Sequence, residues 1–571
     1  MENLERIIDV GRGLVRGDLL LKNCRIVNVF SSKIEEANVI IANKKIVGIG
    51  DYEEADTIID LEGAYLLPGF IDAHVHVESS MLTPFEFARA VGPLGVTSAI
   101  VDPHEIANVL GHDGIKFMLE SSKNNHISLY FMLPSCVPAT HMETSGATLL
   151  AEDIGYFMEK KWVKGLGEVM NYPGVLAKET QILEKIQLAK MKNSDGHAPG
   201  LSGKDLNAYV ATGISTDHEC LTPEEAMEKL ARGMRILIRE GSGAKNLDAL
   251  IGIVTPQNCN RFMFCTDDRH PEDLANHEHI NYSIRRAVEM GLDPMSAVKM
   301  ATINVAEHYN IPRKGAIAPG YWADLVVVND FKHFDIKKVF RSGELIAENY
   351  TFLARAKGED PVNLRGSVNV GYFDRSKLTV ADRGKSIRVI NLIADQIVTT
   401  ESIEAPTVVH GNVVSDPARD LLKIAVIERH MATGNVSVGF VRGFGLKHGA
   451  IASTVSHDSH NIIVVGVSDD DMERAVQELI LSQGGKIVID GGETKALLPL
   501  PIGGLMSRLG LPEVAAQKRT LEAAARALGT TLTSPFMTLS FLALPVIPHL
   551  KITDQGLVDV IKFDFVPLFV E

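Results

Sequence analysis

The chain has few cysteines, and they are not arranged in pairs. Five cysteines are spread over 571 residues, and none stands in a Cys-x-x-Cys spacing. An odd count without that spacing excludes a disulfide framework and a zinc ribbon, and it is typical of a protein from a reducing compartment. We therefore expect a cytoplasmic protein.

Long apolar runs and an excess of positive charge are also missing. No window reaches about 18 uninterrupted apolar residues, the length that predicts a membrane helix, and residues 1–10 carry charges throughout, which argues against a secretory signal. The formal net charge of -15 argues against a nucleic-acid surface. We expect a soluble protein whose partner is a small-molecule substrate, with neither nucleic acid nor a membrane.

Several common catalytic signatures are absent as well. The chain has no G-x-S-x-G elbow, no G-x-x-x-x-G-K-[ST] loop and no P-C-x-x-C motif. His104-Glu105 begins like the zinc-protease signature H-E-x-x-H, but Asn108 occupies the place of the second histidine. These absences exclude the serine-hydrolase elbow, the phosphate-binding loop and two well-known zinc sites.

What is present is the pattern of an α/β protein of two or three domains. Hydrophobic residues make up 45% of the chain and charged residues 23%, as in ordinary globular proteins. From about 67 to 308, apolar strand-like runs alternate with amphipathic helical stretches, which predicts a parallel sheet. The candidate strands number eight, enough to close a (β/α)8 TIM-type barrel: 69–77, 96–101, 127–133, 163–168, 190–196, 211–218, 235–239 and 261–266.

Histidines and carboxylates recur at the ends of these strands. His74 and His76 stand two residues apart on the first strand, so both imidazoles project from one face as a pair of metal ligands. Taken singly, each further residue has an ordinary explanation as a solvated side chain or a helix cap. Together they predict a metal centre, because the carboxyl ends of barrel strands converge. The further candidates are Glu168, His197, His218 and Asp267.

Six such ligands suit a pair of ions better than one zinc ion. Mixed imidazole and carboxylate ligation fits manganese, iron or zinc. We expect two divalent metal ions, with Mn²⁺ favoured and Fe²⁺ or Zn²⁺ as alternatives.

The phrase 68–78 resembles the first metal-binding motif of the amidohydrolase superfamily, and the whole chain resembles the bacterial and archaeal adenine deaminases. The second resemblance rests on the motifs at 74–81, 101–108, 195–200, 265–271 and 455–461. It implies hydrolysis of adenine to hypoxanthine and ammonia, in purine salvage or catabolism. It also implies that His74, His76 and Asp267 hold one ion, that His197 and His218 hold the other, and that Glu168 bridges them where many relatives use a carboxylated lysine. Lys164 precedes that strand end.

The resemblance also implies the domain organisation. A β-sandwich domain would be built from both flanks, 1–66 plus 309–370, around a barrel at 67–308. A polar linker at 370–385 would lead to a C-terminal α+β domain at 386–571, and we expect a homo-oligomer.

Adenine hydrolysis assigns roles to residues around the metals. We expect Asp267, Glu168 and His218 to act in catalysis, with Asp267 relaying the proton of the attacking water to the leaving amine. A second proton donor is required at the ring, and His104, Glu219 and Asp268 are unranked candidates. Asp102 either faces the purine or caps the helix that begins at Pro103. The expected substrate contacts are Asp102, His104, Glu105, Glu78, His457 and His460, and the segment 239–245 after strand seven is a further candidate lining.

The motif His457-Asp458-Ser459-His460 lies far from the barrel in the sequence. A serine triad there is a weak interpretation, because triads join distant residues. We expect this loop to fold over the barrel mouth.

Two other functions remain open at this stage. Dihydroorotase-like or hydantoinase-like hydrolysis of a cyclic amide would be expected to use a lysine bridge and to lack the C-terminal histidine loop. A non-catalytic assembly protein would be expected to have lost metal ligands.

Overall fold

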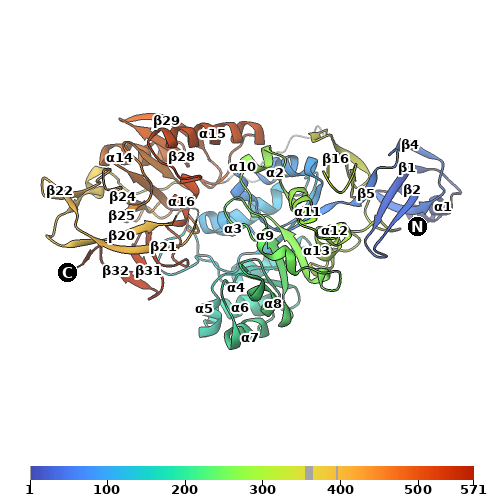
Figure 1. The fold of residues 1–571 in the computed structure, drawn as a ribbon, viewed down its shortest axis with the longest axis horizontal. Coiled ribbons are helices and arrows are strands. Elements are labelled where there is room, and N and C mark those ends of the chain that lie inside the picture. The colour runs from blue at the N-terminus through green and yellow to red at the C-terminus, as the bar shows by residue number, and fades with distance from the viewer. Residues whose placement is uncertain (1, 354–363, 365, 394–395, 571) are drawn as a thin grey trace.

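The protein is described here by a computed structural model covering residues 2–353, 364, 366–393 and 396–570. Three parts follow one another along the long axis of the molecule (Figure 1): an N-terminal sheet at one end, a central α/β part, and a C-terminal part at the other end. The central part carries most of the residues singled out by the sequence.

The central part is a curled parallel sheet whose strands alternate with helices, which fits a TIM-like domain, and closure into an eight-stranded barrel stays a prediction. Five strands form one hydrogen-bonded sheet in chain order: β6 (Phe70–His76), β7 (Val96–Val101), β8 (Ser128–Leu133), β9 (Val163–Val169) and β10 (Asn193–Gly196). Three more strands form a second sheet: β11 (Thr216–Asp217), β12 (Arg235–Arg239) and β13 (Phe262–Cys265). The short strand β14 (Asp267–Asp268) then pairs in parallel with β6, with Asp267 opposite Val75.

Buried carboxylates connect the two sheets where they meet. At one junction, Asp195 of β10 accepts hydrogen bonds from Thr216 Oγ1 of β11 and from the Tyr309 hydroxyl, each at 2.9 Å. At the other, Asp72 of β6 accepts from the amide of Thr266, between β13 and β14, at 3.2 Å. Burial raises the pKa of both carboxyls to about 7 against these hydrogen bonds. Side-chain hydrogen bonds therefore reinforce the curled sheet at its junctions.

One predicted strand in this part is wrong in extent. The sixth strand was expected over 211–218, but helix α7 (Gly203–Ala211) reaches into that range and β11 keeps only two residues. The apolar run before Gly213 belongs to the helix because Leu206 and Tyr209 are its buried face. The sequence after 294 also forms two short helices, α12 (Pro294–Met300) and α13 (Ile303–His308), separated at Thr302, whose φ and ψ of -140° and -93° are not helical.

The N-terminal sheet is built from both flanks of the central part. Its nine strands run in the order β18-β17-β16-β15-β5-β1-β2-β3, with β4 paired to β1. β5 (Tyr65–Pro68) pairs antiparallel with β15 (Leu325–Val328), which joins the two flanks, and the chain then passes directly from β5 into β6. Its core includes Leu21, Ile26 and Phe340. These strands form one continuous ladder, so the two-sheet sandwich stays a prediction, and residues 354–363 and 365 of the predicted segment lie outside the described residues.

The N-terminal sheet contains seven further strands. They are β1 (Gly17–Asn28), β2 (Lys33–Ala42), β3 (Lys45–Gly50), β4 (Ala55–Asp60), β16 (Ile336–Arg341), β17 (Glu344–Glu348) and β18 (Thr351–Phe352).

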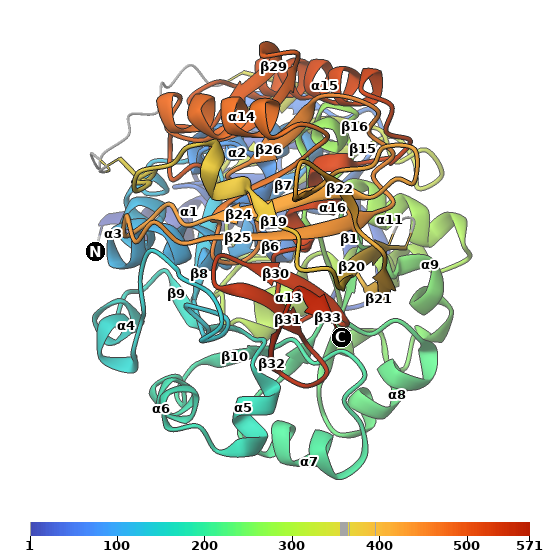
Figure 2. The same cartoon turned by 90° about the vertical axis from the view of Figure 1, so that its left-hand side faces the viewer.

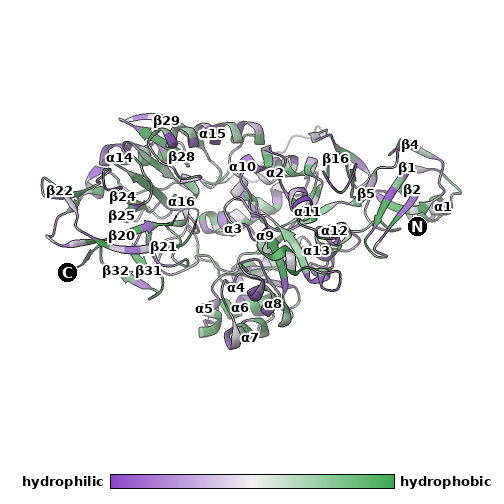
Figure 3. Cartoon of the chain, in the orientation of Figure 1, coloured by the Kyte–Doolittle hydropathy of each residue, from purple (hydrophilic) through white to green (hydrophobic). Residues whose placement is uncertain are grey.

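The C-terminal part is a mixed sheet covered by two helices. Nine strands run in the order β21-β20-β25-β24-β27-β26-β28-β29, with β33 paired to β20, and helices α14 (Asp469–Leu481) and α15 (Leu511–Ala527) lie across them (Figure 2). Hydrophobic residues concentrate along the strands beneath these helices (Figure 3), where Ile487 and Ile489 pack with Met472 and Leu479 of α14.

The strands of this sheet are β20 (Ser386–Leu392), β21 (Thr399–Glu404), β24 (Leu422–Ile427), β25 (Val436–Arg442), β26 (Ala450–Ser453), β27 (Ile462–Gly466), β28 (Gly485–Asp490), β29 (Glu493–Pro499) and β33 (Phe569–Val570). The segment predicted as a polar linker, 370–385, is partly structured: it contains a 3-10 turn (Arg375–Leu378) and strand β19 (Val380–Ala381). The side chain of Leu378 is buried, which anchors the segment.

The C-terminal part packs against the central part through α15. This helix contacts α10 (Pro271–Ala275), and Lys518 Nζ donates a hydrogen bond of 2.6 Å to Glu272 Oε1. None of the described helices has the length and apolarity needed to cross a bilayer.

Candidate active site

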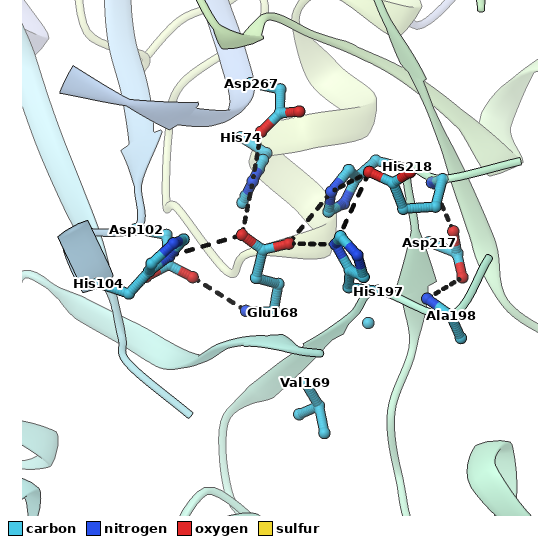
Figure 4. A network of polar contacts seen from close by, with 12 residues as sticks. His74, Asp102, His104, Glu168, Val169, His197, Ala198, Asp217, His218 and Asp267 are labelled. Atoms are coloured by element: carbon cyan, nitrogen blue, oxygen red, sulfur yellow. Dashed lines mark hydrogen bonds and ion pairs between the residues drawn. The ribbon is translucent and has the colours of Figure 1, made fainter. Parts of the chain in front are cut away.

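All six predicted ligands come together at the carboxyl ends of the parallel strands. Glu168 of β9 lies at their centre (Figure 4). Its Oε2 is 2.7 Å from His197 Nδ1 and 3.2 Å from His218 Nε2, while its Oε1 is 3.2 Å from His76 Nε2. One carboxylate therefore faces imidazoles on both sides.

His74, His76 and Asp267 form the first half of this centre. The Nε2 atoms of the two histidines are 3.1 Å apart, because both side chains leave the same face of β6. Asp267 Oδ1 is 3.4 Å from His74 Nε2 and 3.1 Å from His76 Nε2. The pairing of β14 with β6 sets Asp267 opposite Val75, between the two histidines.

The ring orientation of His76 suits a metal ligand. Its Nδ1 is 2.9 Å from the carbonyl oxygen of Asp102, so Nδ1 carries the hydrogen and Nε2 keeps its lone pair. That lone pair points into the group of ligand atoms. Five of the six side chains are buried, and His197 is partly exposed. Their possible ligand atoms fall into groups of three that lie within 4.8 Å of one another, so the centre fits a divalent metal site.

Asp102 holds the backbone of Glu168 in place. Asp102 Oδ2 accepts a hydrogen bond of 3.0 Å from the amide of Glu168. Gly167 allows this approach, because a Cβ there would lie 2.0 Å from Asp102 Oδ2. The helix-cap interpretation of Asp102 is wrong, since its Oδ2 accepts from Glu168, and the first turn of α3 (His104–Ser121) is bonded by Glu78 instead.

Arg239 at the end of β12 pairs with two carboxylates of the site. Its guanidinium donates to both oxygens of Glu219 and, at 2.7 Å, to Asp267 Oδ2. The segment from 239 was a candidate lining, but this pairing was not predicted. The available signal was an arginine that ends the apolar strand Arg-Ile-Leu-Ile-Arg, where a buried cation requires a partner.

Lys164 does not reach the metal centre. Its Nζ donates to the carbonyl oxygen of Asn310, at 3.2 Å, near the start of β9, whereas Glu168 lies four residues later near the end of that strand. The carboxylate that lies between the two halves is that of Glu168, and its role as a bridge stays a prediction.

Comparisons with known proteins agree with this geometry. Residues 65–346 match the amidohydrolase family, and residues 396–564 match the adenine deaminase C-terminal domain. The chain is 49% identical over 567 residues to an adenine deaminase of Desulfatibacillum aliphaticivorans, with 99% of each chain covered. It is 48% identical to one of Methanothrix thermoacetophila, over 100% of both chains.

The chain belongs to the adenine deaminase family. This confirms the resemblance carried by the sequence motifs. Solved structures superpose more loosely, since a dihydropyrimidinase of Brevibacillus agri has a TM-score of 0.46 and 16% identity over 58% of this chain. The family assignment therefore rests on the sequence relatives.

The region matching the adenine deaminase C-terminal domain reaches the barrel mouth. Its loop residues His457 and His460 both contact Glu105 of α3: His457 Nδ1 is 2.8 Å from Glu105 Oε1, and His460 Nε2 bonds Glu105 Oε2. The expected position of this loop over the mouth thus matches the structure.

His104 lies between Glu105 and the metal centre. Its Nδ1 is 3.6 Å from Glu168 Oε1, and its Nε2 is 3.6 Å from Glu105 Oε1. Burial and the neighbouring His76 lower the pKa of His104, but the carboxylates of Asp102 and Glu105 outweigh them and raise it to about 10.

Two other predicted residues are held by protein groups. Glu78 accepts a hydrogen bond from the amide of Ile106 at 3.2 Å, at the start of α3, and its other oxygen is fully buried. Burial raises the pKa of Glu78 to about 7. Asp268 accepts a hydrogen bond from Ser79 Oγ and lies within 4.8 Å of ligand atoms of His76 and Asp267.

Proposed function

We propose that this adenine deaminase family member hydrolyses adenine to hypoxanthine and ammonia at a pair of divalent metal ions, in purine salvage or catabolism. The observation that carries the proposal is the position of Glu168, which two groups of ligands share. One carboxylate between two ligand groups suits two ions.

His74, His76 and Asp267 would hold the first ion, and His197 and His218 the second, with Glu168 shared. Ions bound there would supply Lewis-acid chemistry, which brings the pKa of water from 15.7 towards about 7. Manganese is favoured over iron and zinc on ligand chemistry alone, and homo-oligomerisation stays a prediction.

Asp267 is the residue that moves the proton. Its Oδ1 faces the histidines of the first group, so it lies beside the position where water is activated. Its Oδ2 is held by Arg239, which fixes the carboxylate plane. Asp267 accepts the proton of the water and returns it to the leaving amine, as a general base and then an acid.

The second proton goes to the ring, because attack at C6 places charge on N1. Glu219 is removed from the three candidates, since both of its oxygens accept hydrogen bonds from Arg239 and it is held as an anion. His104 and Asp268 remain. His104 also lies close to the expected substrate contacts Asp102 and Glu105. His218 Nε2 is 3.3 Å from Glu219 Oε1, which helps to fix the position of the second group of ligands.

The test is ammonia release by protein purified with manganese after iron has been chelated during growth. Adenine is compared with adenosine and cytosine by this assay, and bound metal is counted. Hydrolysis of dihydroorotate opens its ring without releasing ammonia, so it is followed separately by the open-chain acid that it would form. We expect activity on adenine with two metal equivalents. Activity on dihydroorotate instead would support a cyclic-amide hydrolase, and metal-loaded protein without any activity would contradict the proposal.

A further inference from the structure

A second group of histidines and a carboxylate lies at the contact between the barrel and the C-terminal part. It consists of Glu105, His457 and His460, which are all buried. Their ligand atoms lie within 4.8 Å of one another, so by distance alone they also suit a metal ion. We call this group the rim cluster.

The hydrogen bonds of His460 argue against a metal in the rim cluster. Its Nδ1 accepts the amide hydrogen of Ser456, at 3.1 Å, so a neutral ring carries its own hydrogen on Nε2. That hydrogen is donated to Glu105 Oε2. A nitrogen that carries a hydrogen has no lone pair for a metal, so His460 instead fixes the carboxylate of Glu105.

The loop that carries these histidines is firmly anchored. The buried guanidinium of Arg429 donates to the carbonyl oxygen of His460 and, at 2.8 Å and 3.0 Å, to those of Ser367 and Gly503. His430 Nε2 bonds the carbonyl oxygen of Ser459 at 2.7 Å. The rim cluster therefore has a fixed geometry.

His457 is the member with an unused ring nitrogen. Its Nδ1 donates to Glu105 Oε1 at 2.8 Å, and its ring stacks on Phe541, with centroids 4.7 Å apart and planes 11° apart. Its Nε2 has no hydrogen-bond partner among the described residues, so this nitrogen is the one left to contact a ligand.

The surroundings of His457 favour its charged form. Burial lowers its pKa, but the charges of Glu105, Asp458 and Asp268 outweigh burial and raise the pKa well above its usual value. In that form Nε2 carries a hydrogen and is a donor. His457 and His104 both approach Glu105 Oε1, at 2.8 Å and 3.6 Å, and His104 Nδ1 is 3.6 Å from Glu168 Oε1. His457 therefore lies close to the metal centre.

We propose that His457 determines substrate specificity by donating a hydrogen bond from Nε2 to a ring nitrogen of the purine, with Glu105 and His460 as its positioning residues. This proposal rests on the proposed function, because it takes the purine to lie at the metal centre. It gives the C-terminal part a direct role in recognition.

The test combines one substitution with a set of analogues. In His457→Phe the ring stacking can remain while both nitrogens are lost, and His457→Gln is a second variant in case the first folds poorly. The matched control is His448→Phe, since His448 also pairs with a carboxylate, Asp490 at 2.8 Å, but is exposed on the surface. Adenine kinetics are measured beside the inhibition constants of 1-, 3- and 7-deazaadenine.

We expect His457→Phe to raise KM for adenine about 10- to 100-fold, the usual effect of losing a hydrogen bond from a charged group. The deazaadenine that lacks the accepting nitrogen cannot form this hydrogen bond even with the wild type, so its inhibition constant should be nearly the same for the wild type and for His457→Phe. The inhibition constants of the other two analogues should rise in His457→Phe by about the same factor as KM for adenine. His448→Phe should behave as the wild type.

Glu105→Gln tests the positioning role. It should raise KM in the same direction as His457→Phe, and the double variant should be little worse than His457→Phe alone, because both changes remove one interaction. Full additivity would contradict the positioning role.

Two outcomes would overturn the proposal. Equal weakening of adenine and all three analogues in His457→Phe would mean that His457 contacts no ring nitrogen. Loss of one metal equivalent in His460→Phe would make the rim cluster a metal site. Failure of the proposed function is separate, since it shows as a wild type that releases no ammonia from adenine.

Discussion

The metal centre and the rim cluster are both built from histidines and carboxylates, but they differ in which ring nitrogen of the histidine carries the hydrogen. In the centre, His76 Nδ1 bonds a carbonyl oxygen, which leaves Nε2 as a lone pair. In the rim cluster, His460 Nδ1 accepts a backbone amide, which places the hydrogen on Nε2. The backbone group behind the ring therefore separates a histidine that suits a metal from one that donates to a carboxylate.

The comparison also separates two kinds of carboxylate. Glu168 faces imidazoles of two ligand groups, whereas Glu105 accepts hydrogen bonds from two histidines of one loop. Substitutions on each side should therefore fail in different ways.

The largest effect is expected from Glu168→Gln. The amide cannot serve as a shared anionic ligand, so the amount of bound metal should fall below two equivalents. We expect kcat to fall at least about 1,000-fold. Metal analysis and ammonia release measure this, with Glu184→Gln on the exposed face of α6 (Thr180–Leu188) as the control. Full metal content with near-normal kcat would show that the two groups do not share Glu168.

Arg239→Gln should have the next largest effect. It removes the guanidinium that pairs with the buried carboxylates of Glu219 and Asp267. We therefore expect the unfolding free energy to fall by about 3 kcal/mol and kcat to fall about 100-fold. Thermal unfolding and steady-state kinetics measure these changes. Arg235→Gln at the other end of β12, where the side chain bonds Asn260 O, should change kcat little; equal kcat losses in both variants would contradict the role of Arg239.

Asp102→Asn should weaken metal binding without abolishing catalysis. The neutral amide is a poorer acceptor for the amide of Glu168, so we expect metal affinity to fall about 10-fold and kcat at saturating metal to change little. Competition with a chelator measures the affinity, and Asp113→Asn on the exposed face of α3 is the control. If KM for adenine rises while metal affinity is unchanged, Asp102 contacts the purine instead.

The smallest effect concerns the contact that holds the rim cluster over the barrel. Lys486 of β28 is buried beneath α15, and burial together with Lys518 lowers its pKa from 10.5 to about 7. Between pH 7 and 10.5 the unfolded chain binds a proton that the folded chain does not, so stability rises with pH in that window and is lost as pH falls towards 7.

Lys486→Met should remove this dependence. We expect the variant to be more stable than the wild type by about 2 kcal/mol at pH 7 and to lose that advantage as the pH approaches 10. Chemical denaturation at several pH values measures it, with kcat as the control that the site is intact. An advantage that does not change with pH would mean that the lysine is not the titrating group.

Much of the metal centre could be predicted from the sequence, because each ligand ends a strand of a parallel sheet. The spacing of His74 and His76 puts them on one face of β6, and the curled sheet brings the other strand ends to the same place. The errors arose where no strand pattern applied. Strand six shrank to two residues because the apolar run before it is the buried face of α7.

The rim cluster was only partly predictable. The motif at 457–460 indicated a loop at the barrel mouth, but nothing in it pointed to Glu105, which lies 355 positions earlier in the chain. Pairing across that distance depends on how the C-terminal sheet is seated by α15. The sequence indicates that Arg239 needs a buried partner, but not that Glu219 and Asp267 are its partners, because three different strand ends supply the residues.

The sequence by itself determined the identity and strand positions of the side chains that we propose as metal ligands, and the family to which the chain belongs. The tertiary structure alone decided which nitrogen of His76 and of His460 carries a hydrogen, which carboxylate lies between the two ligand groups and which is held by an arginine. The physical reason is that strand periodicity is local, whereas the hydrogen-bond partner behind a ring is set by backbone groups from distant parts of the chain.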